Sequence, residues 1–91
     1  MSRIEPGKRV LDIGTGTGDL AIALFRRGCR VTGLDVSAQM LGRAREKSQG
    51  MAISWVDGAA GDLPFPPQSF DGVVSAFVLR SLLPCWEEAF R

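Results

Sequence analysis

The chain has 91 residues, 45% of them apolar, and a net charge of +1, which fits one small globular domain. Eleven basic and ten acidic side chains nearly cancel, so we expect no nucleic-acid partner. The absence of histidine and the wide separation of the two cysteines argue against a zinc site. Without an apolar run of ~20 residues or a signal-peptide pattern, we expect no transmembrane segment and a cytoplasmic location.

The first third of the chain predicts a strand, a glycine-rich loop and a helix. Residues 9–13 form a short apolar run that ends at glycines, which is typical of a buried parallel strand. A helix is expected over 19–27, because Gly28 follows it and its apolar residues recur with helical spacing. The expected buried stripe consists of Leu20, Ala21, Leu24 and Phe25.

The second strand and helix are predicted by the same signals. Residues 30–35 form the strand, and Ser37 is a good N-cap for the helix that follows. Gly50 comes after the helix. Its expected buried residues are Met40, Leu41 and Ala44.

The remainder of the chain predicts two more strands. We expect a third strand over 51–56, a Gly-, Ala- and Pro-rich loop over 57–68, and a fourth strand over 71–77. A helix is expected from Pro84, with Trp86 and Phe90 on one face.

Alternating strands and helices indicate the α/β class, a Rossmann-like open parallel sheet in three αβα layers. The expected strand order is 3-2-1-4, with a ligand crevice beside the first strand. The outer edge of the fourth strand, with Val73, Val74 and Phe77, would then be apolar and unpaired. We therefore expect residues 1–91 to be one cofactor-binding domain that is incomplete at its C-terminal side. It would be a fragment, a truncated gene product, or one partner of an assembly in which self-association or a second chain completes the sheet.

Gly14, Gly16 and Gly18 follow a strand and open a helix, which is the setting of a ligand-binding loop. A side chain at these positions would block the approach of a ligand, and glycine tolerates a tight turn. The dinucleotide spacing G-x-G-x-x-G/A fails from Gly14 and fits only weakly from Gly16, with Ala21 in third place. The spacing acidic-x-G-x-G-x-G fits directly and includes Asp12.

Two carboxylates stand at the ends of the first two strands. Asp12 could hold a cationic α-amino group of the ligand or brace the glycine turn by accepting N–H bonds. Asp35 lies 21 residues after Gly14, where a carboxylate can accept hydrogen bonds from both ribose hydroxyls. The alternative for Asp35 is a structural role before the helix that begins after Ser37.

Three ordered segments resemble the class I S-adenosylmethionine-dependent methyltransferases, and cover about residues 7–82. They read V-L-D-I-G-T-G-T-G-D-L-A, G-L-D-V-S-x-x-M-L-x-x-A-R and D-L-P-F-P-x-x-S-F-D-G-V-V. Within that class, the ubiquinone/menaquinone-biosynthesis C-methyltransferases are the most similar group. Thr17-Gly18-Asp19 and the run Phe77-Val78-Leu79-Arg80 favour this group.

The resemblance implies S-adenosylmethionine as cofactor and a set of contacts to it. The residues implied are Asp12, Gly14, Thr15, Gly16, Thr17, Gly18, Asp35, Val36, Met40, Ala59 and Ala60. The loop would take the methionine part, Asp35 the ribose, and Val36 and Met40 the adenine. Ala59 departs from the polar residue that the family carries there, which Asp57 or Asp62 could replace, while Ala60 keeps its backbone N–H.

The expected activity is methyl transfer to a small molecule such as a quinone precursor. Alignment and desolvation can drive such an in-line displacement, and no residue can be named as a catalytic base. Two alternatives are a module that binds S-adenosylmethionine or S-adenosylhomocysteine without catalysis and, less favoured by the glycine spacing, an NAD-dependent oxidoreductase.

Overall fold

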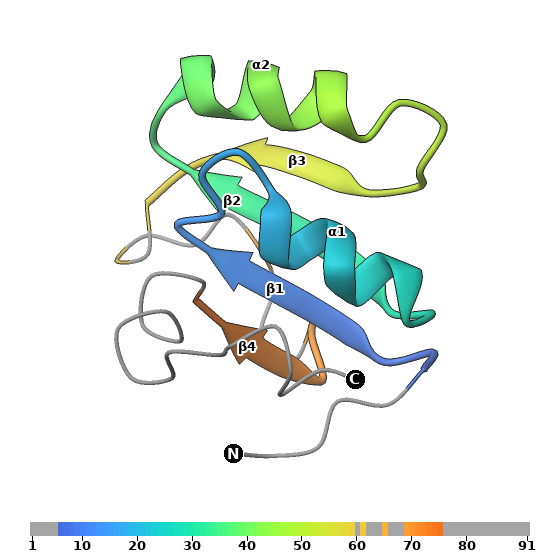
Figure 1. The fold of residues 1–91 in the computed structure, drawn as a ribbon. Coiled ribbons are helices and arrows are strands. Elements are labelled where there is room, and N and C mark those ends of the chain that lie inside the picture. Colours follow the sequence, from blue (N-terminus) through green and yellow to red (C-terminus); the bar gives the residue numbers. More distant parts are fainter. Residues whose placement is uncertain (1–5, 60, 62–64, 66–68, 76–91) are drawn as a thin grey trace, which may run out of the picture.

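The computed structural model describes residues 6–59, 61, 65 and 69–75 of the chain (Figure 1). Its elements are β1 (Arg9–Ile13), α1 (Asp19–Arg26), β2 (Arg30–Asp35), α2 (Ala38–Lys47), β3 (Ser54–Asp57) and β4 (Gly72–Val74). All neighbouring strands are parallel and their order is β3-β2-β1-β4. This order confirms the predicted Rossmann-like sheet. The helix expected from Pro84, with Trp86 and Phe90, lies outside the described residues.

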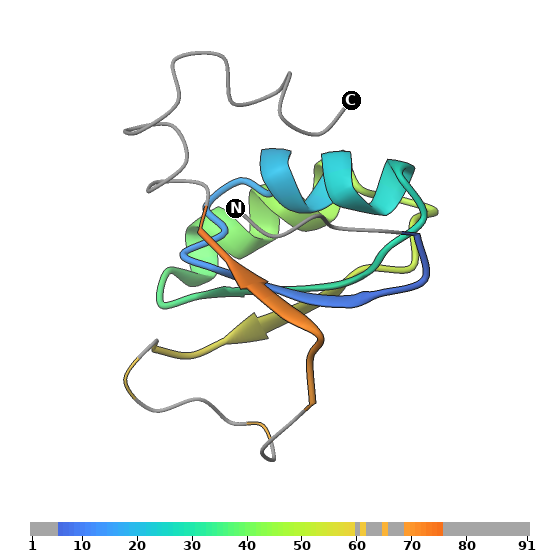
Figure 2. The same cartoon turned by 90° about the horizontal axis from the view of Figure 1, so that it is seen from below.

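Both described helices cover the same face of the sheet (Figure 2). Alternation along the strands places Val10, Val31 and Trp55 on this face, since cross-strand partners in register share a side. The core between sheet and helices consists of Val10, Leu20, Ala21, Leu24, Cys29 and Val31. The predicted stripe of α1 is confirmed, with Phe25 only partly buried at its edge.

The start of α2 differs from the sequence prediction in one side chain. Ser37 caps the helix as expected, since its Oγ accepts a hydrogen bond of 3.2 Å from the backbone N–H of Met40. Leu41 and Ala44 are buried, but Met40 is 39% exposed, so its predicted burial is wrong. Met40 lies in the first turn of α2, just after β2 has ended, and therefore lies beside the edge of the sheet rather than over it.

β3 begins at Ser54, later than the predicted strand over 51–56. The N–H groups of Met51 and Ile53 are used in local turns, donating to the carbonyls of Ser48 and Met51 at 2.9 Å each. These bonds bend the apolar run before it can join the sheet. Only Ser54–Asp57 then pairs with β2.

β4 is Gly72–Val74, so the predicted strand over 71–77 begins one residue later and does not include Ser75, while residues 76 and 77, with the predicted edge residue Phe77, lie outside the described residues. Asp71 anchors its start, accepting a hydrogen bond of 2.8 Å from the backbone N–H of Arg9 and forming an ion pair with its guanidinium. Val73 is 58% exposed, as expected for the outer strand, whereas Val74 packs against the core on the helix face. The alternation of the strand therefore exposes only one of these two valines.

Candidate functional site

The glycine loop lies at the C-terminal end of β1, over the end of β2. The backbone N–H of Thr15 donates to the carbonyl of Leu34 at 2.9 Å, and that of Gly18 donates to the carbonyl of Thr15 at 3.0 Å. Gly14, Gly16 and Gly18 have φ values of 66°, 59° and 86°, a left-handed region that other residues adopt only with strain. The glycines at these three positions therefore give the loop its conformation.

The three glycines face different surroundings. A Cβ atom built on Gly14 or Gly16 would have no neighbour within 4 Å, so both present bare backbone to open space. A Cβ atom on Gly18 would lie 2.6 Å from Cη2 of Trp55 and 3.1 Å from Cβ of Ala44. The open space that a ligand would need is thus present at Gly14 and Gly16, whereas at Gly18 packing inside the protein leaves no room for a side chain.

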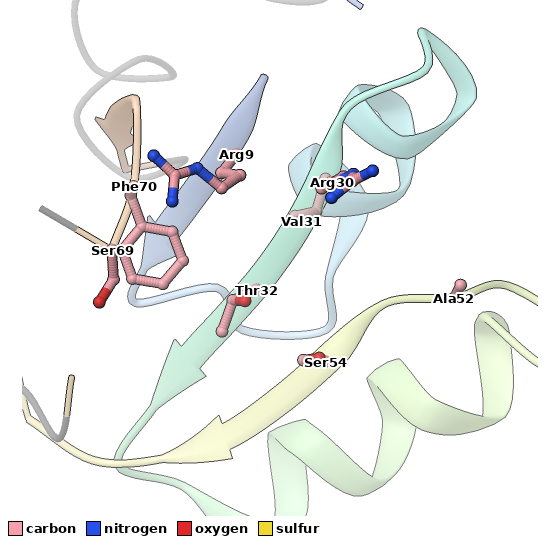
Figure 3. A pocket seen from close by; sticks show the side chains of 8 residues that line it. All are labelled: Arg9, Arg30, Val31, Thr32, Ala52, Ser54, Ser69 and Phe70. Carbon is pink, nitrogen blue, oxygen red and sulfur yellow. The ribbon is translucent and has the colours of Figure 1, made fainter. Parts of the chain in front are cut away.

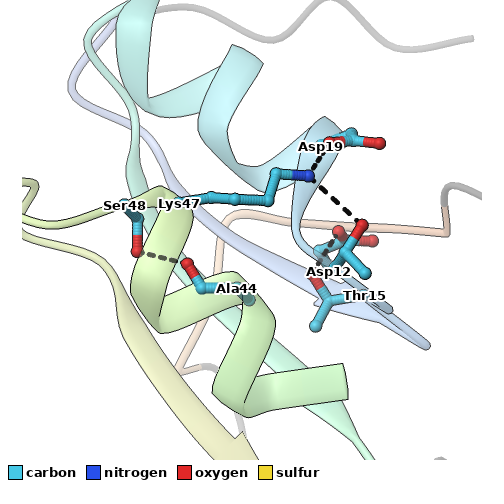
Figure 4. Close-up of polar contacts among 7 residues, drawn as sticks. Asp12, Thr15, Asp19, Ala44, Lys47 and Ser48 are labelled. Carbon is cyan, nitrogen blue, oxygen red and sulfur yellow. Dashed lines mark hydrogen bonds and ion pairs between the residues drawn. The ribbon is translucent and has the colours of Figure 1, made fainter. Parts of the chain in front are cut away.

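Asp12 and Thr15 form a buried pair beneath the loop (Figure 4). Asp12 and Thr15 are 0% and 3% exposed, and the Asp12 carboxylate accepts a hydrogen bond of 2.8 Å from the Thr15 hydroxyl. Of the two roles left open for Asp12, this contact corresponds to the brace of the turn, with the Thr15 hydroxyl as one of its donors. The Thr15 side chain points inward to this brace and away from the open space over the loop.

Asp35 connects the glycine loop with the start of α2. Its Oδ2 accepts a hydrogen bond of 2.8 Å from the backbone N–H of Gly16, and its Oδ1 accepts one of 2.9 Å from that of Ser37. A carboxylate offers about four acceptor positions, so each oxygen keeps one for a ligand. The structural and ligand-binding roles considered for Asp35 are therefore compatible.

Exposed apolar side chains lie next to this carboxylate. Val36 is 71% and Met40 39% exposed, and both belong to the turn and first helical turn after Asp35. Asp57 ends β3 in register with Asp35, and the backbone N–H of Gly58 donates to the Asp35 carbonyl at 3.0 Å. Loop, carboxylate and apolar surface thus follow one another along the same edge of the sheet.

Three predicted site positions remain, namely Thr17 in the glycine loop and Ala59 and Ala60 after β3. Ala59 is exposed just after β3, and Ala60 lies outside the described residues. The Thr17 hydroxyl accepts a hydrogen bond of 3.2 Å from the ammonium of Lys47, which also pairs with Asp19 (Figure 4). Since a hydroxyl can accept and donate together, Thr17 keeps its donor for a ligand. Lys47 was missed by sequence reasoning, because no local pattern relates it to a loop 30 residues away.

A hollow of about 460 Å³ lies on the face of the sheet away from the helices (Figure 3). Among its lining residues are Arg9, Arg30 and Ser54, which begin their strands at the end opposite to the glycine loop. The guanidinium of Arg9 is already engaged by Asp71. This hollow shares no residue with the predicted site.

A parallel sheet with a glycine loop after β1 and a carboxylate at the end of β2 defines the class of Rossmann-like nucleoside-binding folds. Residues 10–91 match the family model described as "Methyltransferase domain". The chain therefore belongs to this methyltransferase family.

Individual relatives agree with this assignment. The chain is 41% identical over 83 residues to the demethylmenaquinone methyltransferase of Tropheryma whipplei (strain Twist), covering 90% of this chain and 34% of that protein. It is 43% identical over 82 residues to the phosphatidylethanolamine N-methyltransferase of Cereibacter sphaeroides, covering 86% and 39%. A crystal structure of an S-adenosylmethionine-dependent methyltransferase from Mesorhizobium loti matches with a TM-score of 0.75 and 32% identity, covering 81% of this chain and 35% of that one.

The chain spans about a third of the length of these relatives. Residues 10–91, which match the family model, include the glycine loop and Asp35. Neither described helix has the length and apolar character needed to cross a membrane. The cytoplasmic location expected from the sequence stays a prediction.

Proposed function

We propose that this chain binds S-adenosylmethionine and forms the cofactor-binding part of a methyltransferase that acts on a small molecule. The observation that carries the proposal is the carboxylate of Asp35, tied at 2.8 Å to the N–H of Gly16 and placed beside the open space over Gly14 and Gly16. A carboxylate next to bare backbone suits a ribose joined to an amino acid. The carboxylate can accept hydrogen bonds from the ribose hydroxyls, and the glycines leave room for the amino-acid part of the ligand.

The described residues fit the parts of that cofactor in order along the sheet edge. The loop at the end of β1 would take the methionine part, Asp35 the ribose hydroxyls, and the exposed Val36 and Met40 one face of the adenine. Asp12 would act from below, through Thr15, by holding the turn in shape. S-adenosylmethionine, when bound, supplies a methyl group activated by a sulfonium.

For the acceptor we propose a quinone precursor as the first compound to test. The support is the demethylmenaquinone methyltransferase from Tropheryma whipplei, 41% identical over 90% of this chain. Identity to the phosphatidylethanolamine N-methyltransferase is 43%, so the matched segment does not by itself separate the two acceptors. We assign no catalytic base, since alignment of donor and acceptor is the contribution that this segment can make.

Titration calorimetry with S-adenosylhomocysteine, S-adenosylmethionine and NAD tests the proposal. We expect binding of the first two, loss of that binding in Asp35→Ala, and unchanged binding in Glu46→Ala, which removes an exposed carboxylate of α2 outside the site. Response to NAD alone would overturn the assignment. Transfer of a labelled methyl group to demethylmenaquinone then distinguishes an enzyme from a module that only binds.

A further inference from the structure

We infer that Trp55 of β3 is a positioning residue, held by Ser48, whose indole ring sets the place of the glycine loop and so the affinity for the amino-acid part of the ligand. The inference rests on the proposed function. It concerns a residue on β3, two strands away from β1, whose side chain packs below the loop and away from the open space over Gly14 and Gly16.

The indole fills the space that two missing side chains leave. A Cβ atom on Gly33 of β2 would lie 2.4 Å from Cζ3 of Trp55, and one on Gly18 would lie 2.6 Å from its Cη2. The six-membered ring is therefore in close contact with the strand on one side and the loop on the other. Close-packed interiors leave little room for adjustment, so a shift of the ring moves Gly18 with it.

The buried hydroxyl of Ser48 holds the indole ring of Trp55 in its orientation. The indole N–H of Trp55 donates to Oγ of Ser48 at 3.0 Å, and the same hydroxyl donates to the carbonyl of Ala44 at 2.7 Å. Ser48 is the C-cap residue of α2 and is 4% exposed. The end of α2 thereby fixes the position of the side chain of β3.

The position of Gly18 is transmitted to the ligand-facing part of the loop through backbone contacts. Gly18 is the N-cap of α1, and its N–H donates to the carbonyl of Thr15 at 3.0 Å. This bond closes the short turn that contains Gly16, whose own N–H is held by Asp35. A loosened indole would widen this turn while leaving Asp35, Val36 and Met40 in place.

This separation gives a test with two ligands in the full chain. S-adenosylhomocysteine uses the loop and the nucleoside surface, whereas 5′-methylthioadenosine has the nucleoside but lacks the amino acid. We expect Trp55→Phe, which loses both the N–H and the outer ring atoms next to Gly18 and Gly33, to weaken S-adenosylhomocysteine by more than about fivefold, the size of one neutral hydrogen bond. The affinity for 5′-methylthioadenosine should change less than about twofold.

Ser48→Ala removes the other partner of the same hydrogen bond. We expect a loss of about fivefold, the part that belongs to the hydrogen bond, and the double variant should lose no more than Trp55→Phe alone, since Ser48 acts only through the indole N–H. Val31→Ala, a core substitution on the same face, serves as the control for lowered stability and should affect both ligands equally.

Equal losses for both ligands in Trp55→Phe, or additive losses in the double variant, would overturn the positioning role and leave the proposed function standing. Failure of the folded wild-type chain to bind S-adenosylhomocysteine would overturn the proposed function, and this inference with it.

Discussion

Alanine substitutions at Gly14 and at Gly18 should have different effects on stability and on ligand binding, because Gly14 faces the proposed ligand and Gly18 faces the core. Both residues have positive φ, 66° and 86°, so a Cβ atom costs about 1–2 kcal/mol at either position. At Gly14 that is the whole effect on stability, because no atom lies within 4 Å of the new methyl group. We expect Gly14→Ala to lower the free energy of unfolding by about 1–2 kcal/mol.

Gly18→Ala adds a collision to the same backbone strain. The new Cβ atom would lie 2.6 Å from Cη2 of Trp55 and 3.1 Å from Cβ of Ala44, and overpacking of this kind costs about 1–3 kcal/mol. The total loss should therefore be about 2–5 kcal/mol. In a Trp55→Leu background, which removes the ring, the additional cost of Gly18→Ala should fall towards that of Gly14→Ala.

Urea unfolding measures the stabilities, and calorimetry with S-adenosylhomocysteine measures the binding. Gly14→Ala should bind at least about tenfold more weakly than wild type while it remains mostly folded, since its methyl group occupies the ligand's side of the loop. If Gly18→Ala were no more destabilised than Gly14→Ala, the packing of Trp55 under the loop would be wrong. If Gly14→Ala bound normally, the open space above the loop would not be the ligand's.

Further outcomes follow from the charged residues. Asp35→Asn should lower affinity for S-adenosylhomocysteine about tenfold, because an amide has one acceptor oxygen for the contacts that a carboxylate makes with two; unchanged affinity in calorimetry would count against the ribose contact. The hydrogen bond from Arg9 lowers the pKa of Asp71 to about 2, so the stabilisation from this pair should be present above about pH 4 and be lost as the pH falls through 2. An NMR titration checks this, and in Arg9→Ala the midpoint should rise towards the ordinary value, whereas an unmoved midpoint would exclude Arg9 as the cause. Lys47→Met should change the free energy of unfolding by less than about 1 kcal/mol, since its ion pair with Asp19 is exposed. A larger loss of stability in urea unfolding would contradict this reasoning.

The regular part of the fold was predictable because its signals are local. The bounds of β1 and β2 were predicted to the residue, since each is a short apolar run that ends at a turn residue or a carboxylate. Ser37 was predicted as a cap from its position alone, and its hydrogen bond to Met40 confirms it. The alternation of strands and helices was enough for the order β3-β2-β1-β4, because right-handed crossovers leave few other arrangements.

The parts that sequence reasoning missed depend on contacts between distant residues. Met40 has the helical spacing of a buried residue, but the sheet ends before it. Gly18 belongs to the loop pattern, yet the reason for its lack of a side chain is Trp55, 37 positions further along the chain. A local sequence pattern cannot show whether the space next to a glycine is open or filled by another residue. The structure shows open space at Gly14 and Gly16 and the side chain of Trp55 at Gly18.

The direct test of the central claim is a two-dimensional ¹H–¹⁵N NMR titration of the labelled chain with S-adenosylhomocysteine. The amide signals of Gly14, Gly16 and Val36 should move together with one dissociation constant. Those of Arg30 and Ser54, at the opposite end of the strands, should stay in place. Shifts centred on Arg30 and Ser54, with the loop unaffected, would contradict the account.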